Sequence, residues 1–148
     1  MTKHVYLVSI DALRIDCVPY QQDKSFLKKH RVLKYLKIPT LEKLTKKSLN
    51  FELATTTAPY TSASHASLFT GLYPPRTNVR SFFNPSSSSL NKNLITLAEV
   101  FKSEGYKTVF ATDEESVFKP LDLHRGFDYF FPINDDKLIS FIKKNKNE

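Results

Sequence analysis

The sequence contains little cysteine and little glycine. Cys17 is the single cysteine among 148 residues, which excludes an internal disulfide bond and a zinc site built from several cysteines. Gly71, Gly105 and Gly126 are the three glycines, too scattered for a glycine-rich phosphate loop, so the sequence has neither a P-loop nor a dinucleotide fingerprint. In such a chain we expect each glycine where the backbone needs a positive φ or a close approach.

Long hydrophobic runs are missing as well. No stretch approaches the roughly 18 apolar residues needed to cross a bilayer. The apolar run that begins at Val5 is broken by Asp11, too early for the core of a secretory signal. We therefore expect a cytoplasmic protein with no membrane span and no export signal.

The composition is that of a globular chain with an excess of positive charge. Hydrophobic residues make up 41% and charged residues 25%, and the formal net charge is +7. This charge indicates anionic partners, such as phosphate or sulfate esters, nucleic acid or acidic lipid. Much of it lies between Asp23 and Lys47, where leucines interrupt the lysines. A solvated helical face is favoured there over a nucleic-acid surface, so we expect no nucleic-acid partner.

Strand-like and helix-like segments alternate along the chain. Parallel strands are predicted at three short β-rich segments: Val5–Ile10, Asn50–Ala54 and Thr108–Thr112. Helices are predicted at four segments: Leu41–Ser48, Ser64–Thr70, Leu94–Glu104 and Asp135–Lys143. This alternation predicts an α/β fold with a mostly parallel central sheet flanked by helices.

Polar residues and glycines mark the expected ends of these helices. Thr40, Asn93 and Asn134 stand where each could cap the start of a helix. Gly105 stands at the C′ position of the third predicted helix, and Gly71 closes the second.

Asp11 follows directly on the first predicted strand. The run from Val5 to Ile10 shows little alternation, which is typical of a buried parallel strand. A carboxylate at the end of such a strand is a candidate functional group. An edge strand that ends in a solvated aspartate is the alternative.

Hydroxyl side chains crowd residues 55–67, where a short apolar helix begins. The unpaired N–H groups and the dipole at a helix N-terminus favour an oxyanion, and a positioned hydroxyl can attack an ester there. On spacing alone, hydroxyls that merely cap the helix are the favoured alternative.

Five segments, taken in order, resemble the sulfatase family. They are residues 11–14, 40–51, 61–74, 96–108 and 125–128. The third, T-S-A-S-H-A-S-L-F-T-G-L-Y-P, resembles the sulfatase signature C-x-P-S-R-A-S-L-L-T-G-x-Y-P. The resemblance implies that residues 1–148 are the N-terminal portion of a single sulfatase-like α/β domain of the alkaline phosphatase superfamily, truncated so that its C-terminal half is absent.

The family implies metal-assisted hydrolysis or transfer of a sulfate or phosphate ester, with a small anionic ester as substrate. By resemblance, Thr61 is the nucleophile and a metal ligand, Asp11 is a metal ligand, and His65 binds the substrate. For His65, a plain helix-surface position is the alternative. An oxygen-rich site suits one hard divalent ion, calcium first and magnesium or manganese next.

Several positions depart from the family pattern. Thr61 replaces the residue that sulfatases oxidise to formylglycine, which points to the phosphotransferase and phosphodiesterase branches. Ala12 stands where a second carboxylate is expected, so a second chain or further sequence is expected to complete the site. At Asp113 and Glu114, solvated loop charges are favoured over metal ligands. A truncated, inactive fold that binds anions or a protein is the alternative function.

Overall fold

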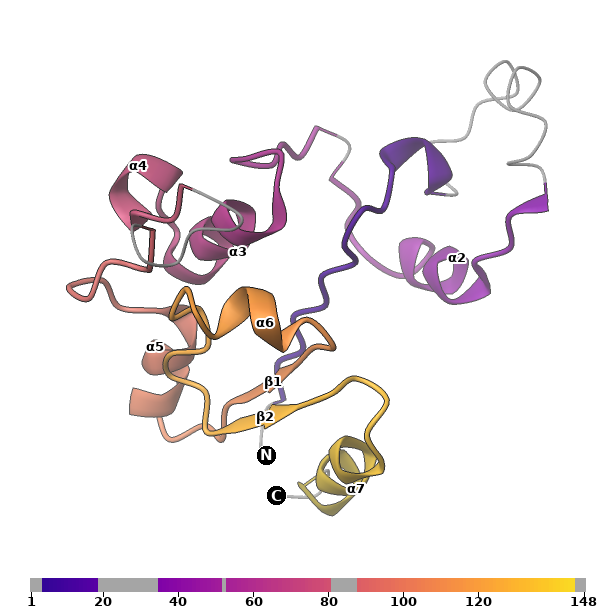
Figure 1. Cartoon of the computed structure of the whole chain (residues 1–148). Helices are drawn as coiled ribbons and strands as arrows, with labels where there is room; N and C mark the ends of the chain where they lie inside the picture. Colours follow the sequence, from indigo (N-terminus) through magenta and orange to yellow (C-terminus); the bar gives the residue numbers. More distant parts are fainter. Residues whose placement is uncertain (1–3, 19–34, 52, 81–87, 146–148) are drawn as a thin grey trace. The chain divides into compact units, whose positions relative to one another are not determined.

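The computed structural model describes residues 4–18, 35–51, 53–80 and 88–145 (Figure 1). The chain divides into two compact units. The smaller unit is residues 5–55, and the larger unit is residues 56–148 together with residues 1–4. No helix within the described ranges is long and apolar enough to cross a membrane.

The smaller unit contains a 3-10 turn, η1 (Ile15–Cys17), and helix α2 (Pro39–Thr45). Thr40 lies inside α2 and Ile38 is its N-cap, so the prediction that Thr40 caps this helix is wrong. The helix begins earlier because Pro39 occupies its first position, where the fixed φ of proline suits a helix and its missing N–H costs nothing.

The structure forms no strand at residues 5–10, nor at the described residues of 50–54, so the strand predictions there are wrong. A strand of this apolar kind is stabilised by burial on both faces. The side chains of Val5, Leu7 and Val8 are instead 61%, 54% and 77% exposed. An apolar run alone does not make a strand when no neighbour completes its hydrogen bonds.

The described residues form a two-stranded sheet, which lies in the larger unit. Strand β1 (Val109–Ala111) pairs in parallel with β2 (Tyr129–Phe131), with Phe110 opposite Phe130. The third predicted strand is thereby confirmed, whereas β2 was not predicted. The short helix α6 (Glu115–Phe118) lies between the two strands in sequence, so the pair is a small βαβ unit consistent with the expected α/β class.

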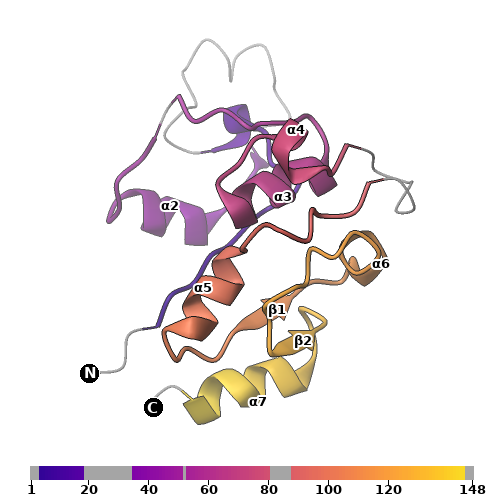
Figure 2. The same cartoon turned by 90° about the vertical axis from the view of Figure 1, so that its left-hand side faces the viewer.

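Four further helices surround this sheet in the larger unit. They are α3 (Thr61–Thr70), α4 (Pro74–Thr77), α5 (Leu97–Ser103) and α7 (Asp136–Asn145). Figure 2 shows β1 on the side of α5 and β2 on the side of α7. The predicted helices are present, although α4 and α6 were not predicted.

Two further predicted helix caps, Asn93 and Asn134, are wrong, and the glycine predictions are confirmed. Thr96, not Asn93, caps α5, because Thr96 and Glu99 form a reciprocal capping box. At α7, the Asp135 carboxylate accepts a bond from the N–H of Lys137, so the capping oxygen comes one residue after Asn134. All three glycines have positive φ, between 70° and 92°.

The core of the larger unit fixes α3 against the sheet. Its buried side chains are Ala66, Phe69, Val79, Leu90, Phe118, Leu121 and Leu123. Phe110 of β1 meets Phe69 of α3 edge-on at 5.7 Å and Phe118 of α6 at 4.9 Å between ring centroids. These aromatic contacts hold the hydroxyl-rich helix in one position relative to β1 and α6.

Candidate functional site

The first turn of α3 begins at Thr61, behind a tyrosine. Tyr60 is the N-cap residue, its backbone is extended, and it makes no side-chain capping bond. Its hydroxyl instead donates to the carbonyl oxygen of Arg80 at 2.9 Å. The interpretation that a hydroxyl side chain caps α3 is therefore wrong. A chemical role for these hydroxyls stays a prediction.

The Ser64 hydroxyl is tied to Thr56. Thr56 Oγ1 lies 3.0 Å from the carbonyl oxygen of Ala58 and 2.9 Å from Ser64 Oγ. A carbonyl oxygen only accepts, so the single Thr56 proton points to Ala58. Ser64 must then donate its own proton to Thr56, and it has none left for another acceptor.

Burial separates the remaining hydroxyls of α3. Ser62 is fully buried and Ser67 is 6% exposed. Within the described part of the chain, Ser67 Oγ has no hydrogen-bond partner. Thr61 is partly exposed. Of the hydroxyls in the first turn, Thr61 combines access with a position at the positive end of the helix dipole.

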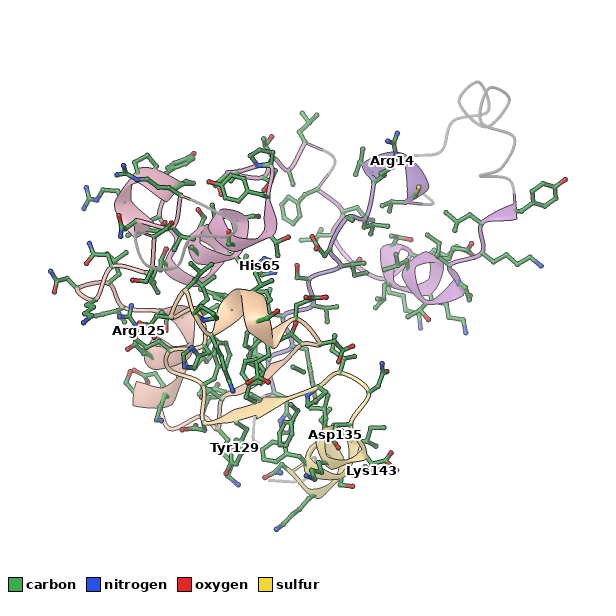
Figure 3. The ribbon with its side chains drawn as sticks, in the orientation of Figure 1. Arg14, His65, Arg125, Tyr129, Asp135 and Lys143 are labelled. Carbon is green, nitrogen blue, oxygen red and sulfur yellow. The ribbon has the colours of Figure 1, made fainter. Side chains whose placement is uncertain are left out.

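His65 is held against α3 and α6 (Figure 3). Its Nδ1 lies 2.8 Å from the carbonyl oxygen of Thr61, four residues earlier. Its ring meets Phe69 and Phe118 edge-on, with centroids 5.9 Å and 5.1 Å apart. These contacts make His65 a half-buried, oriented residue and not a plain surface histidine.

Asp11 belongs to the smaller unit, whereas Thr61 and His65 belong to the larger one. Asp11 stands at a tight turn, where its Oδ1 accepts the N–H of Ala12 at 3.0 Å and Ala12 has a φ of 56°. A positive φ is strained for alanine, and strained backbone conformations cluster at functional sites. That Asp11 and Thr61 share one metal ion stays a prediction.

The described residues contain no group of three histidine, cysteine, aspartate or glutamate side chains that could hold a metal ion. Asp113 has a different use, because its Oδ1 accepts the N–H of Ile133 at 2.9 Å and joins the end of β1 to the segment after β2. Glu114 is the N-cap residue of α6, and its N–H donates to Thr112 Oγ1.

Arg125 joins three segments of the larger unit. Its guanidinium donates to the carbonyl oxygens of Asn91 at 3.2 Å and Leu94 at 2.9 Å. It also lies 3.6 Å from the Glu99 carboxylate and 3.5 Å from that of Asp122. Arg125 thus holds the segment before α5 against the segment before β2.

Thr108 and Asp128 fix the start of β1. Thr108 Oγ1 donates to the carbonyl oxygen of Gly126 at 2.8 Å and accepts the N–H of Asp128 at 3.0 Å. Asp128 in turn accepts the N–H of Thr108 and pairs with Lys102. The hydrogen bond from Lys102, with that from the Thr108 backbone, lowers the pKa of Asp128.

Gly126 completes this arrangement. A Cβ atom there would lie 2.6 Å from the backbone nitrogen of Glu99, at the start of α5. We name the whole set the clamp: Thr96, Glu99, Thr108, Arg125, Gly126 and Asp128. In the sequence, residues 96–108 and 125–128 are recognisable only as family motifs. The structure gives their residues a shared architectural role.

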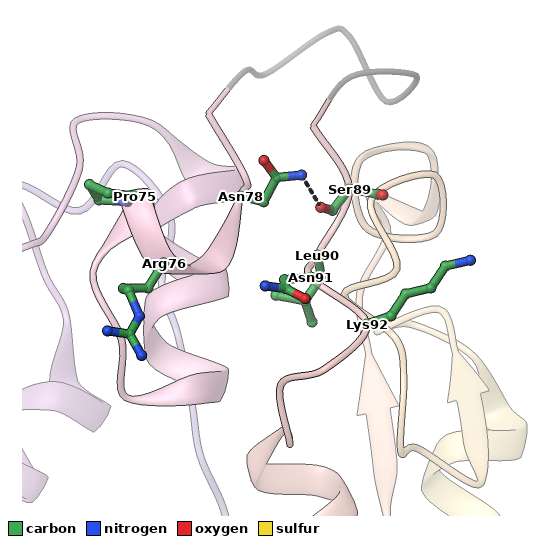
Figure 4. A pocket seen from close by; sticks show the side chains of 7 residues that line it. All are labelled: Pro75, Arg76, Asn78, Ser89, Leu90, Asn91 and Lys92. Atoms are coloured by element: carbon green, nitrogen blue, oxygen red, sulfur yellow. Dashed lines mark hydrogen bonds between the residues drawn. The ribbon is translucent and has the colours of Figure 1, made fainter.

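A polar pocket of about 360 Å³ lies between α4 and residues 89–92 (Figure 4). Asn78 donates across it to the carbonyl oxygen of Ser89 at 3.1 Å. Arg76 and Lys92 line it, but Figure 4 shows their side chains extending in different directions. The pocket therefore does not gather its two cations around one ligand.

Two curated proteins similar to this chain in sequence are sulfatases. The ulvan-active sulfatase of Formosa agariphila is 34% identical over 101 residues, which cover 64% of this chain and 19% of that protein. Human steryl-sulfatase is 27% identical over 116 residues, which cover 68% of this chain and 20% of that protein. The chain thus spans about a fifth of the length of these relatives. No solved structure matches it.

The sulfatase family model matches residues 3–147, which include α3, the clamp and Asp11. This match covers nearly the whole chain, and the chain belongs to the sulfatase family.

Proposed function

We propose that the protein hydrolyses a small sulfate ester and that Thr61 is the nucleophile. The observation that carries this proposal is the placement of Thr61 at the first position of α3, partly exposed, while the neighbouring Ser62 is fully buried. Family membership supports the reaction class. The names of both relatives favour sulfate over phosphate esters.

The first turn of α3 is suited to an oxyanion. An α-helix leaves its first N–H groups without intrahelical partners, and its dipole adds partial positive charge there. Both effects favour a sulfate group beside Thr61. Attack by Thr61 Oγ1 on sulfur forms a sulfated threonine and breaks the bond from sulfur to the alcohol oxygen. Water then releases sulfate and restores the hydroxyl.

The proposal includes a divalent cation with Asp11 and Thr61 as two of its ligands. Calcium is the first candidate, and magnesium or manganese come next. The described residues provide no cluster of three ligands, so further ligands would have to come from additional sequence or a second chain.

The experiment is an assay of an aryl sulfate and an aryl phosphate, with added calcium and with chelator, on wild type, Thr61→Ala and Ser64→Ala. We expect sulfate turnover that falls by at least about 10³-fold in Thr61→Ala and by only a few fold in the matched control. Wild-type turnover by Thr61→Ala would exclude it as nucleophile. Ester binding without turnover by wild type would favour the inactive, anion-binding alternative.

A further inference from the structure

Helix α7 packs on β2 through one of its sides. Phe141 lies against Tyr129 and Phe131, with ring centroids 4.7 Å and 5.8 Å apart. The Lys107 ammonium donates to Asn145 Oδ1 at 2.9 Å and holds the end of the helix to the segment before β1. These contacts fix the orientation of α7 on the sheet, on the β2 side that Figure 2 shows.

The apolar side of α7 extends beyond this contact. Ile139 and Ile142 are neighbours on the helix surface, because they lie three positions apart, and they are 47% and 41% exposed. Tyr129, beside Phe141, is 40% exposed and continues the apolar surface. No residue of α7 is buried. An amphipathic helix that leaves its apolar row in solvent offers an interaction surface.

Charges of opposite sign lie at the two ends of this apolar row. Asp136 comes three positions before Ile139 and Lys143 comes four positions after it, so the three residues share one face of the helix. Both charged side chains are exposed. This face is complementary to itself when a second α7 runs in the opposite direction, because the negative start of each helix then meets the positive end of the other.

An acidic membrane surface fits this face less well. A helix that lies on acidic lipid carries cations beside its apolar residues. Helix α7 instead begins with Asp135 and Asp136, and Asp136 lies on the same face as Ile139. Acidic headgroups would repel this carboxylate, whereas a second copy of the helix would pair with it. The charge pattern therefore favours a second copy of the chain as the partner.

We propose that the protein self-associates through α7, with two copies of the helix packed antiparallel about a two-fold axis. Ile139 and Ile142 of one copy pack against the same residues of the other, and Asp136 of each copy pairs with Lys143 of the other. Such a contact is isologous and closes at two copies. A helix of 10 residues is about 15 Å long, so the interface is small and the dimer weak. The proposal does not depend on the proposed function.

The first test measures the association by sedimentation equilibrium from low micromolar to millimolar concentration. Each copy carries a net charge of +7, so physiological ionic strength is used, where charges are screened beyond about 8 Å. We expect a reversible dimer that Ile139→Gln weakens by at least about tenfold, because each dimer loses two apolar contacts. Ile95→Gln, at an exposed isoleucine outside α7, is the control and should leave the dimer unchanged.

The second test reverses the charges. Asp136→Lys and Lys143→Asp should each weaken self-association by about 3–10-fold, because like charges then face each other across an exposed interface. An equimolar mixture of the two variants, with one of them labelled, should associate as strongly as wild type. In that mixed dimer each residue 136 meets a residue 143 of opposite charge.

Lys144→Asp is the matched control for the second test. It makes the same charge change at the same end of the helix, with the same cost against the helix dipole. Lys144 comes two positions after Ile142, on the opposite side of the helix. We therefore expect Lys144→Asp to dimerise as wild type does.

The proposal can be overturned in several ways. A monomer at every concentration would overturn it, as would a dimer that Ile139→Gln leaves unchanged. A mixture of the two charge variants that stays monomeric would overturn the antiparallel pairing. Binding of a monomeric wild type to vesicles of phosphatidylcholine and phosphatidylglycerol, lost in Ile139→Gln, would assign the face to acidic lipid instead. Urea unfolding of each variant shows that the protein tested is folded.

Discussion

The start of α3 and the clamp both carry family motifs, yet their side chains are used differently. In the clamp, Thr96 and Thr108 are 1% and 7% exposed, and each hydroxyl donates to a backbone carbonyl. At the start of α3, Thr61 is partly exposed, and His65 Nδ1 contacts the Thr61 carbonyl oxygen. Motifs of equal strength in sequence therefore differ in structure: the clamp hydroxyls are buried and bonded to the backbone, whereas Thr61 has the access that the proposed chemistry requires.

The largest expected effect on stability is that of Gly126→Ala. The new Cβ would overlap the Glu99 backbone nitrogen at 2.6 Å, and the φ of 92° is unfavourable for alanine. We expect a loss of about 3 kcal/mol or more in the free energy of unfolding, measured with urea.

Gly105→Ala is the matched control, because Gly105 has a φ of 84° but open space around it. We expect it to cost about 1 kcal/mol. Equal losses in the two variants would show that the close approach at Gly126 contributes nothing.

Arg125→Gln should have the next largest effect. The substitution removes a charged donor from the Asn91 and Leu94 carbonyls. A hydrogen bond that involves a charged group contributes about 1.5–3 kcal/mol to the free energy of unfolding. We expect a loss of about 2 kcal/mol in urea unfolding. Lys119→Gln breaks only an exposed pair with Glu115 and should cost below about 0.5 kcal/mol. Similar costs would contradict the role given to Arg125.

Thr108→Val tests the hydroxyl at the start of β1. Valine keeps the shape but leaves the Gly126 carbonyl and the Asp128 N–H without this partner. We expect a loss of about 1–2 kcal/mol in the free energy of unfolding. Ser103→Ala, which removes an exposed hydroxyl bonded to the Val100 carbonyl, is the control and should change little. A neutral Thr108→Val would separate this residue from the clamp.

The smallest effect is the acid dependence contributed by Asp128. Its pKa is lowered, first by Lys102, so its stabilisation is present above the ordinary carboxyl pKa of about 3.9 and is lost as pH falls through the lowered pKa. Asp128→Asn should therefore lose less stability than wild type on acidification, as followed by urea midpoints between neutral and acidic pH. Asp136→Asn, on α7, should keep the wild-type dependence, and identical curves for Asp128→Asn and wild type would contradict the expectation.

Local signals predicted α3, α5 and β1 because each has its pattern within a few residues. The cap of α5 was assigned to Asn93 although Thr96 and Glu99 have capping-box spacing. Strand β2 (Tyr129–Phe131) is as short as β1 but contains no β-branched residue, and it was not predicted.

The clamp could not be predicted from the sequence in this way. Its bonds join residues far apart, such as Thr108 with Gly126, 18 positions later, and Asn91 with Arg125, 34 positions later. The Val5–Ile10 strand failed for a related reason, since a strand depends on a distant partner that composition does not reveal. Thr61 and His65 were assigned through the resemblance of residues 61–74 to the sulfatase signature, whereas the orientation of the His65 ring came only from the structure.

The most direct test of the account is the kcat/KM for an aryl sulfate in Thr61→Ala beside Thr108→Val, each measured where it is folded. The account predicts a loss of at least about 10³-fold for Thr61→Ala and a change within about threefold for Thr108→Val. Turnover that survives in Thr61→Ala, or that disappears in folded Thr108→Val, would contradict the division between a chemical α3 and an architectural clamp.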